Sequence, residues 1–138
     1  MAKRFYVDTS AYLCVLLGEA GHKSMQREFA GAELLSSVLL LLEAGRNLVR
    51  LSREGVLTAV EFQICVSALE EDMHQFMLRD LTLDLCAARA MPVVSTPRSL
   101  DLAHLRTALW FDEQQKITRF VSLDEDQILS AREVGLPV

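Results

Sequence analysis

The chain has 138 residues, of which 51% are hydrophobic, and its formal net charge is -5. This length fits a single domain, residues 1–138, and the negative charge argues against a protein that holds nucleic acid by bulk positive charge. The negative charge is nevertheless compatible with a nucleic-acid enzyme, since metal ions neutralise carboxylates and local arginines bind phosphates. We expect a soluble, cytoplasmic protein without membrane contact, because the sequence lacks a signal peptide's apolar core and any bilayer-spanning apolar run.

The first expected element is a buried strand, Phe5–Val7, that runs directly into Asp8, followed by an apolar helical segment over 11–17. At the carboxyl edge of an open α/β sheet, ligands bind beside the free N–H groups of the next helix. Asp8 is therefore a candidate functional residue. Asp8, Thr9 and Ser10 are also good helix N-caps, and a capping role is the alternative.

The rest of the chain alternates short strands with helices. We expect strands at 33–36, 75–79 and 117–124, with 136–138 as a candidate edge strand, and helices at 22–29, 38–52, 59–70, 81–90, from 99 onward and at 127–134. Such alternation predicts a three-layer α/β/α sandwich with a central, mainly parallel twisted sheet of four to five strands. The expected N-caps of four helices are Ser36 or Ser37, Thr58, Asp80 and Ser99.

Glu43 is an unusual residue in its segment, because Leu39–Leu42 precede it and Ala44 follows. A helix that is apolar on every side is buried, so a carboxylate within it is either paired or functional. The structural alternative is an ion pair with Arg46 or Arg50.

Two further carboxylates occupy informative positions. Asp124 ends the last strong strand as Asp8 ends the first, and Asp101 lies in the first turn of the helix that begins at Ser99. His104, three residues after Asp101, is expected to be a supporting or surface histidine rather than a ligand. The proline-containing segment Met91–Pro97 is expected to be a loop.

Together, these acids predict a metal site. Four carboxylates in one pocket would repel strongly, and a divalent cation relieves that repulsion. Oxygen ligands without a nearby Cys or His pair select Mg²⁺ or Mn²⁺, and the implied chemistry is metal-assisted phosphodiester hydrolysis. Motifs of competing enzyme classes are absent from the sequence, and Cys14, Cys65 and Cys86 are expected to be buried free thiols.

Several segments resemble the PIN-domain ribonucleases, and among them the VapC-type toxins of bacterial toxin–antitoxin modules. The segments that carry the resemblance are Tyr6–Ala11, Ser37–Glu43, Arg98–Ala108, Phe120–Asp124 and Ala131–Val138. They span essentially the whole chain in the family's order. The proline-containing approach to Asp101 departs from the pattern and could alter substrate access.

The resemblance implies an acidic, catalytic metal-binding set at Asp8, Glu43, Asp101 and Asp124. It matches Ser10 to a hydroxyl near the metal, Ser122 to the hydroxyl two residues before the last acid, and Asp126 to an extra acid that only some members carry. It also implies a homodimer, and a small cognate antitoxin whose C-terminal segment occupies the acidic groove.

Two other surfaces bear on partners. Leu48, Leu51, Val60 and Ile64 supply more apolar helical surface than one sheet can bury, which favours dimerisation or helix-in-groove binding. The candidates for RNA phosphate contacts are Arg50, Arg98 and Arg106, together with Arg46 and Arg53; each alone is also compatible with a solubilising role.

The preferred interpretation is a Mg²⁺- or Mn²⁺-dependent endoribonuclease toxin. The alternative is a catalytically silent PIN-like module that binds RNA or protein. A phospho-receiver domain is weaker, because it requires a lysine at the last strand, and no lysine follows Asp124.

Overall fold

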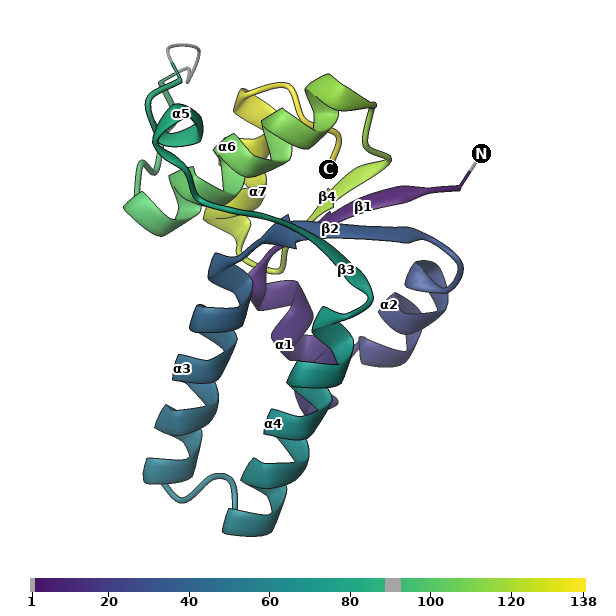
Figure 1. Cartoon of the computed structure of the whole chain (residues 1–138), viewed down its shortest axis with the longest axis vertical. Helices are drawn as coiled ribbons and strands as arrows, with labels where there is room; N and C mark the ends of the chain where they lie inside the picture. Colours follow the sequence, from purple (N-terminus) through teal and green to yellow (C-terminus); the bar gives the residue numbers. More distant parts are fainter. Residues whose placement is uncertain (1, 89–92) are drawn as a thin grey trace.

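The structure is a computed structural model that describes residues 2–88 and 93–138 (Figure 1). Its elements are β1 (Arg4–Val7), α1 (Thr9–Leu17), α2 (His22–Phe29), β2 (Glu33–Ser37), α3 (Leu39–Arg53), α4 (Ala59–Met73), β3 (Phe76–Arg79), α5 (Leu83–Cys86), α6 (Ser99–Gln114), β4 (Arg119–Val121) and α7 (Glu125–Glu133). These bounds confirm most of the expected elements.

The strands form a four-stranded parallel sheet in the order β3-β2-β1-β4. β1 lies inside the sheet, where Phe5 is paired with Leu34 of β2 on one side and Tyr6 with Phe120 of β4 on the other. Because the strands are parallel, their carboxyl ends lie at one edge. The residue after β1 stays attached to β4, since the backbone N–H of Asp8 donates to the carbonyl of Val121 at 3.1 Å.

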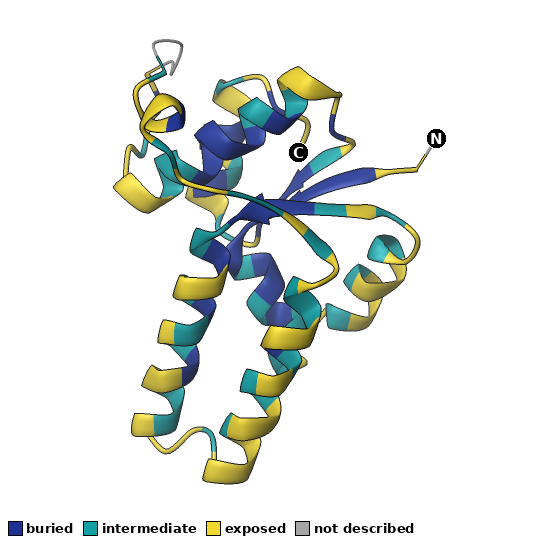
Figure 2. Cartoon of the chain, in the orientation of Figure 1, coloured by how far each residue is buried: buried dark blue, intermediate teal, exposed yellow. Residues whose placement is uncertain are grey.

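The two faces of the sheet bury separate apolar clusters. Side chains alternate along β1, so Phe5 and Val7 pack with residues of α1, α3 and α4, whereas Tyr6 packs with α6 and α7. Figures 1 and 2 show these helices on opposite sides of the buried strands. The expected three-layer α/β/α architecture is confirmed, with a sheet of four strands.

Three expected elements are different in the structure. The strand expected over 117–124 is shorter, because β4 covers only Arg119–Val121. The helix expected over 81–90 is only the short α5, whose N-cap is Thr82 rather than Asp80; residues 89 and 90 lie outside the described residues. Thr82 has the better position, since its hydroxyl accepts from the N–H of Leu85. Residues 136–138 form no strand, although the carbonyl of Pro137 accepts from the N–H of Phe120 at 2.7 Å.

The other expected caps had mixed outcomes. Thr58 caps α4 in a reciprocal capping box with Glu61, as expected. Ser36 instead points into the sheet and donates to the carbonyl of Val7 at 2.7 Å. Ser37 accepts from the N–H of Leu39 at 3.1 Å, although the N-cap position itself is one residue later. Ser99 is the first residue of α6 and not its cap.

The α3–α4 hairpin extends away from the sheet and corrects the expectation of a fully buried α3 (Figures 1 and 2). Leu42 is 70% exposed, whereas Leu48 is fully buried in the core and is not spare surface. The expected apolar surface survives at Val60 and Ile64, both of which are exposed on α4. No helix within the described ranges is both long and apolar enough to cross a membrane.

The cysteines differ in burial. Cys14 is buried, Cys65 is half-buried and Cys86 is exposed, so the expectation of three buried thiols is wrong for Cys86. All three are free in the part of the chain that the structure describes. Burial raises the pKa of the Cys14 thiol, which makes it a poor nucleophile.

Candidate active site at the carboxyl edge of the sheet

Asp8 lies at the carboxyl end of β1 and is the N-cap of α1. Its Oδ1 accepts from the backbone N–H of Ala11 at 3.1 Å and from the hydroxyl of Ser10 at 2.7 Å. Asp8 therefore caps α1 and also lies at the carboxyl edge of the sheet. Burial raises the pKa of Asp8, against the hydrogen bonds that favour the ionised form.

Two serine hydroxyls join the Asp8 loop to the Asp124 loop. The Oγ atoms of Ser10 and Ser122 are 3.2 Å apart, and the Ser10 hydroxyl also accepts from the N–H of Leu123 at 2.9 Å. Ser122 accepts in turn from the N–H of Asp124 at 3.1 Å. The two expected supporting hydroxyls thus fix the relative positions of the acids that end β1 and β4.

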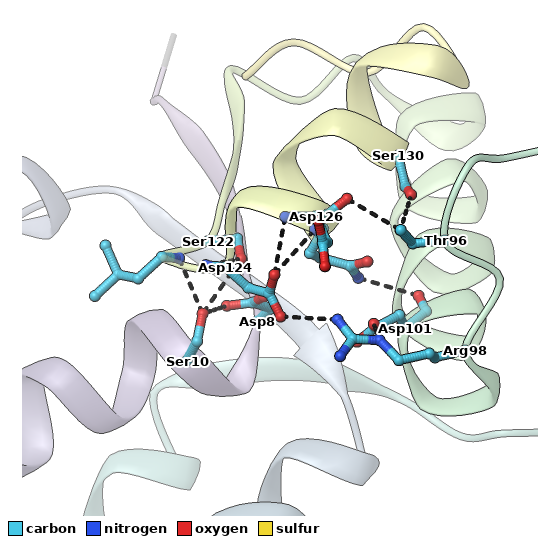
Figure 3. Close-up of polar contacts among 11 residues, drawn as sticks. Asp8, Ser10, Thr96, Arg98, Asp101, Ser122, Asp124, Asp126 and Ser130 are labelled. Carbon is cyan, nitrogen blue, oxygen red and sulfur yellow. Dashed lines mark hydrogen bonds and ion pairs between the residues drawn. The ribbon is translucent and has the colours of Figure 1, made fainter.

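Asp124 has a separate contact for each carboxylate oxygen. Oδ1 caps α7 by accepting from the N–H groups of Asp126 and Gln127, at 2.9 and 3.3 Å. Oδ2 accepts from the guanidinium of Arg98 at 3.0 Å, and the same guanidinium donates to Asp101 at 2.8 Å. Figure 3 shows Arg98 extending from the start of α6 to Asp124, with Asp8 close to Asp124.

Asp101 is less exposed than its partner Arg98, with side-chain exposures of 22% and 59%. Burial raises the pKa of the Asp101 carboxyl, and the adjacent positive charge of Arg98 acts in the opposite direction. The backbone of Asp101 is also anchored, because its carbonyl accepts from the side-chain amide of Gln127 at 3.1 Å.

Asp126 lies beside this group but is exposed (Figure 3). Its carbonyl accepts from Thr96 at 3.3 Å, and Thr96 also contacts Ser130 at 2.9 Å. These contacts attach the described part of the expected loop, 93–97, to α7. Met91 and Pro92 lie outside the described residues.

Glu43 reaches the site from α3 and has a different partner from those expected. Its Oε1 accepts from the Thr9 hydroxyl at 2.8 Å and from Nε2 of His104 at 2.7 Å. Arg50 instead pairs with Glu54, so the expected Glu43–Arg50 pair is not formed. Burial acts to raise the pKa of Glu43, but His104, Thr9 and the nearby charge of Arg46 together lower it.

His104 is the residue whose importance the sequence did not reveal. It is only 3% exposed, and its Nδ1 lies 2.7 Å from the hydroxyl of Tyr6. Its spacing of three residues from Asp101 placed it on the same helix face, but nothing in the local pattern indicated that Glu43 and Tyr6 would be its partners.

The candidate substrate-binding arginines are dispersed. Arg98 contacts the acids, whereas Arg106 is buried and donates to the carbonyl of Leu85 at 3.3 Å. Arg50 lines a depression of about 390 Å³ that also includes Ser10 and Leu123. That depression connects α3 with the loop that carries Asp124.

The donor chemistry of this edge fits a hard divalent cation, because Asp101 and Asp124 provide carboxylate oxygens at one guanidinium and Asp8 provides another beside the Asp124 loop. Within residues 2–88 and 93–138, however, no three His, Cys, Asp or Glu side chains form a ready-made ion site. The acids are gathered at one edge, but each already has protein donors.

No protein-family model matches the sequence, and no curated protein matches it. The fold does match a solved structure, that of VapC20 of Mycobacterium tuberculosis, which is described as a toxin that cleaves the sarcin–ricin loop. The TM-score is 0.58 over 96% of this chain and 95% of that chain, at 17% sequence identity. The chain therefore has the PIN-like fold of a VapC toxin, as the sequence resemblance predicted.

Proposed function

We propose that this protein is a divalent-metal-dependent endoribonuclease that hydrolyses RNA phosphodiester bonds. The observation that carries the proposal is that Asp101 and Asp124 share Arg98 at the carboxyl edge of the sheet, where the Ser10 and Ser122 hydroxyls join the Asp124 loop to Asp8. This is the edge where open α/β sheets bind ligands. The shared fold with an RNA-cleaving toxin supports the same assignment.

Asp8, Glu43, Asp101 and Asp124 would hold Mg²⁺ or Mn²⁺, with Asp126 as an additional acid. When bound, the metal would supply an activated water and stabilise the leaving oxygen. The protein's own contribution is rigid placement, because Asp8 and Asp124 are fixed as helix caps and Glu43 is fixed by two donors. The supporting hydroxyls would be those of Ser10 and Ser122.

Arg98 and Arg50 would contact RNA phosphates. Arg98 lies beside the acids, and Arg50 lines the neighbouring depression. Arg106 would first have to leave its buried contact with Leu85. Phosphate contacts of this kind fix the position of the strand but do not read its sequence.

The biological role that we propose is that of the toxin in a type II toxin–antitoxin pair, which inhibits translation in the cytoplasm. Its partners would be RNA, a small cognate antitoxin and a second copy of the chain. The exposed side chains of Val60 and Ile64 on the α3–α4 hairpin provide apolar surface for such contacts.

The test is cleavage of total RNA in the presence of Mn²⁺ or Mg²⁺. Asp8→Asn and Asp124→Asn should abolish cleavage without unfolding the protein, and EDTA should stop cleavage by the unmodified chain. Asp80→Asn is a matched control. Asp80 also follows a strand, but it is exposed, and its strand β3 is the edge strand on the opposite side of the sheet from β4. Cleavage that persists in EDTA would refute the metal mechanism.

A second candidate function is a silent PIN-like module that binds RNA or protein. The observation that favours it is that the described acids already have protein donors and form no ready-made ion site. Mn²⁺ titration discriminates between the two, since a silent module should not show metal binding that depends on Asp8 and Asp124.

A further inference from the structure

We propose that His104 is a positioning residue that fixes the carboxylate of Glu43 for metal binding, through a buried hydrogen-bond chain that begins at Tyr6. The inference rests on the proposed function, because it assigns Glu43 to the metal site. In this proposal His104 contacts neither the metal nor the substrate and acts only through Glu43.

Both nitrogens of the His104 ring are engaged. Nδ1 lies 2.7 Å from the Tyr6 hydroxyl, and Nε2 lies 2.7 Å from Oε1 of Glu43. With the ring only 3% exposed, neither nitrogen has a lone pair directed at solvent. His104 is therefore not arranged as a metal ligand.

The donor inventory fixes the Glu43 end of the chain. An ionised carboxylate only accepts, so Nε2 must carry the proton that is shared with Glu43. At the other end, the Tyr6 hydroxyl both donates and accepts, so it can bond Nδ1 whether or not that nitrogen carries a proton. The result is a chain of hydrogen bonds that joins Tyr6, His104 and Glu43, with hydrogen on Nε2 of the ring.

The origin of the chain is rigid. Tyr6 is fully buried in β1, and its ring stacks on Phe120 of β4 with centroids 5.3 Å apart and an interplanar angle of 7°. Its partner His104 lies on α6, and Glu43 lies on α3. The chain therefore ties the end of a flexible side chain on the α3–α4 hairpin to the centre of the sheet.

Glu43 needs this support more than the other acids do. Asp8 and Asp124 are short side chains fixed as helix caps, whereas a glutamate has an additional rotatable bond. Thr9 and His104 both donate to Oε1, and no hydrogen bond to Oε2 is found within the described residues. One oxygen is thus fixed by the protein while the second is kept for a ligand, as in carboxylates oriented around metal sites.

The experiment is a Mn²⁺ titration by calorimetry on the full chain and its variants. His104→Leu, which removes both hydrogen bonds, should weaken Mn²⁺ binding by about 10- to 100-fold. His104→Gln keeps a donor near the Nε2 position and should stay within a few-fold of the unmodified chain. Tyr6→Phe keeps the stacked ring and should give an intermediate loss.

Tyr12→Phe is the matched control. It also removes a tyrosine hydroxyl with a carboxylate partner, Asp72 at 2.8 Å, and within the described residues neither side chain is hydrogen-bonded to Glu43 or His104. Its Mn²⁺ affinity should be unchanged. Equal losses in Tyr6→Phe and Tyr12→Phe, or no loss in His104→Leu, would overturn the positioning role.

A second readout does not require metal or activity. In the metal-free protein, imidazole ¹⁵N spectra should show His104 with its proton on Nε2, with the signal assigned by its loss in His104→Gln. Glu43→Gln should shift that signal, because it changes the acceptor. A ring without a proton on Nε2 would refute the inference. If the unmodified chain binds no Mn²⁺ while the tautomer is as expected, the proposed function fails and the hydrogen-bond chain stands.

Discussion

Asp124 carries two separable roles, and paired substitutions should resolve them. One carboxylate oxygen caps α7 through the N–H groups of Asp126 and Gln127, while the other faces Arg98. Asparagine is as good an N-cap as aspartate, whereas alanine offers no acceptor. Asp124→Asn therefore removes the charge but keeps the cap, and Asp124→Ala removes both.

The magnitudes follow from those contacts. Loss of an N-cap costs about 1 kcal/mol, and loss of a negative charge at a helix N-terminus costs about 0.5 kcal/mol. We expect the free energy of unfolding to fall by about 0.5 kcal/mol in Asp124→Asn and by about 1.5 kcal/mol in Asp124→Ala. In a domain of this size, these values correspond to melting-temperature losses of about 2 °C and 6 °C.

The assay combines urea unfolding with RNA cleavage in Mn²⁺. Both variants should lose cleavage equally, although their stabilities differ, because the proposed metal site needs the charge. Equal stability losses would show that the cap is not formed in solution. Cleavage retained by Asp124→Asn would show that the charge is not needed and would refute the catalytic assignment.

Three further predictions concern stability. Burial raises the pKa of Asp8 above its ordinary value of 3.8. Ionisation of this carboxyl therefore lowers the free energy of unfolding, and that loss disappears as the pH falls toward 3.8. Asp8→Asn should therefore stabilise the metal-free protein at pH 7, and urea titrations should show the gain shrinking toward pH 4. Thr58→Ala should lower the melting temperature through a cap loss of about 1 kcal/mol; an unchanged value would contradict the capping box. Leu48→Ala should cost about 2–5 kcal/mol in urea unfolding, whereas the exposed Val60→Ala should change stability by less than about 0.5 kcal/mol.

The architecture could be predicted because its signal is local. Each of β1 and β4 is an apolar, β-prone run that ends directly in or near a carboxylate, and parallel pairing then places those carboxylates at one edge. Asp8 and Asp124 are therefore found together without knowledge of any side-chain contact. Their capping roles are local as well, since each accepts from backbone groups two or three residues later.

The burial of α3 was predicted less well because four consecutive leucines obscure the helical period. The buried stripe is Leu40, Ala44 and Leu48, which are spaced four residues apart on one face. Leu42 lies off that stripe and is exposed. The periodicity is present in the sequence, but the uninterrupted apolar run predicts burial on every side, which the structure contradicts.

The partner of Glu43 could not be predicted, because His104 is 61 residues away and Tyr6 is 98 residues from His104. Within α3, the nearest basic residues were Arg46 and Arg50, so helix spacing favoured those pairs. Only the packing of α6 across the sheet brings the imidazole to Glu43. Contacts of this kind depend on tertiary structure and leave no periodic signal.

The charge compensation at this edge changes the physical basis of the metal assignment. From the sequence alone, the clustered acids are expected to repel too strongly to remain ionised without a dication. In the structure, Glu43 has His104, Asp101 and Asp124 share Arg98, and Asp8 has hydroxyl and backbone donors. Repulsion alone therefore does not require a metal. What supports the proposed metal is instead the oxygen-rich donor set and the fold. A dication bound by Asp101 and Asp124 would have to displace the exposed Arg98 guanidinium from both carboxylates. The displaced guanidinium would then be available to bind a phosphate.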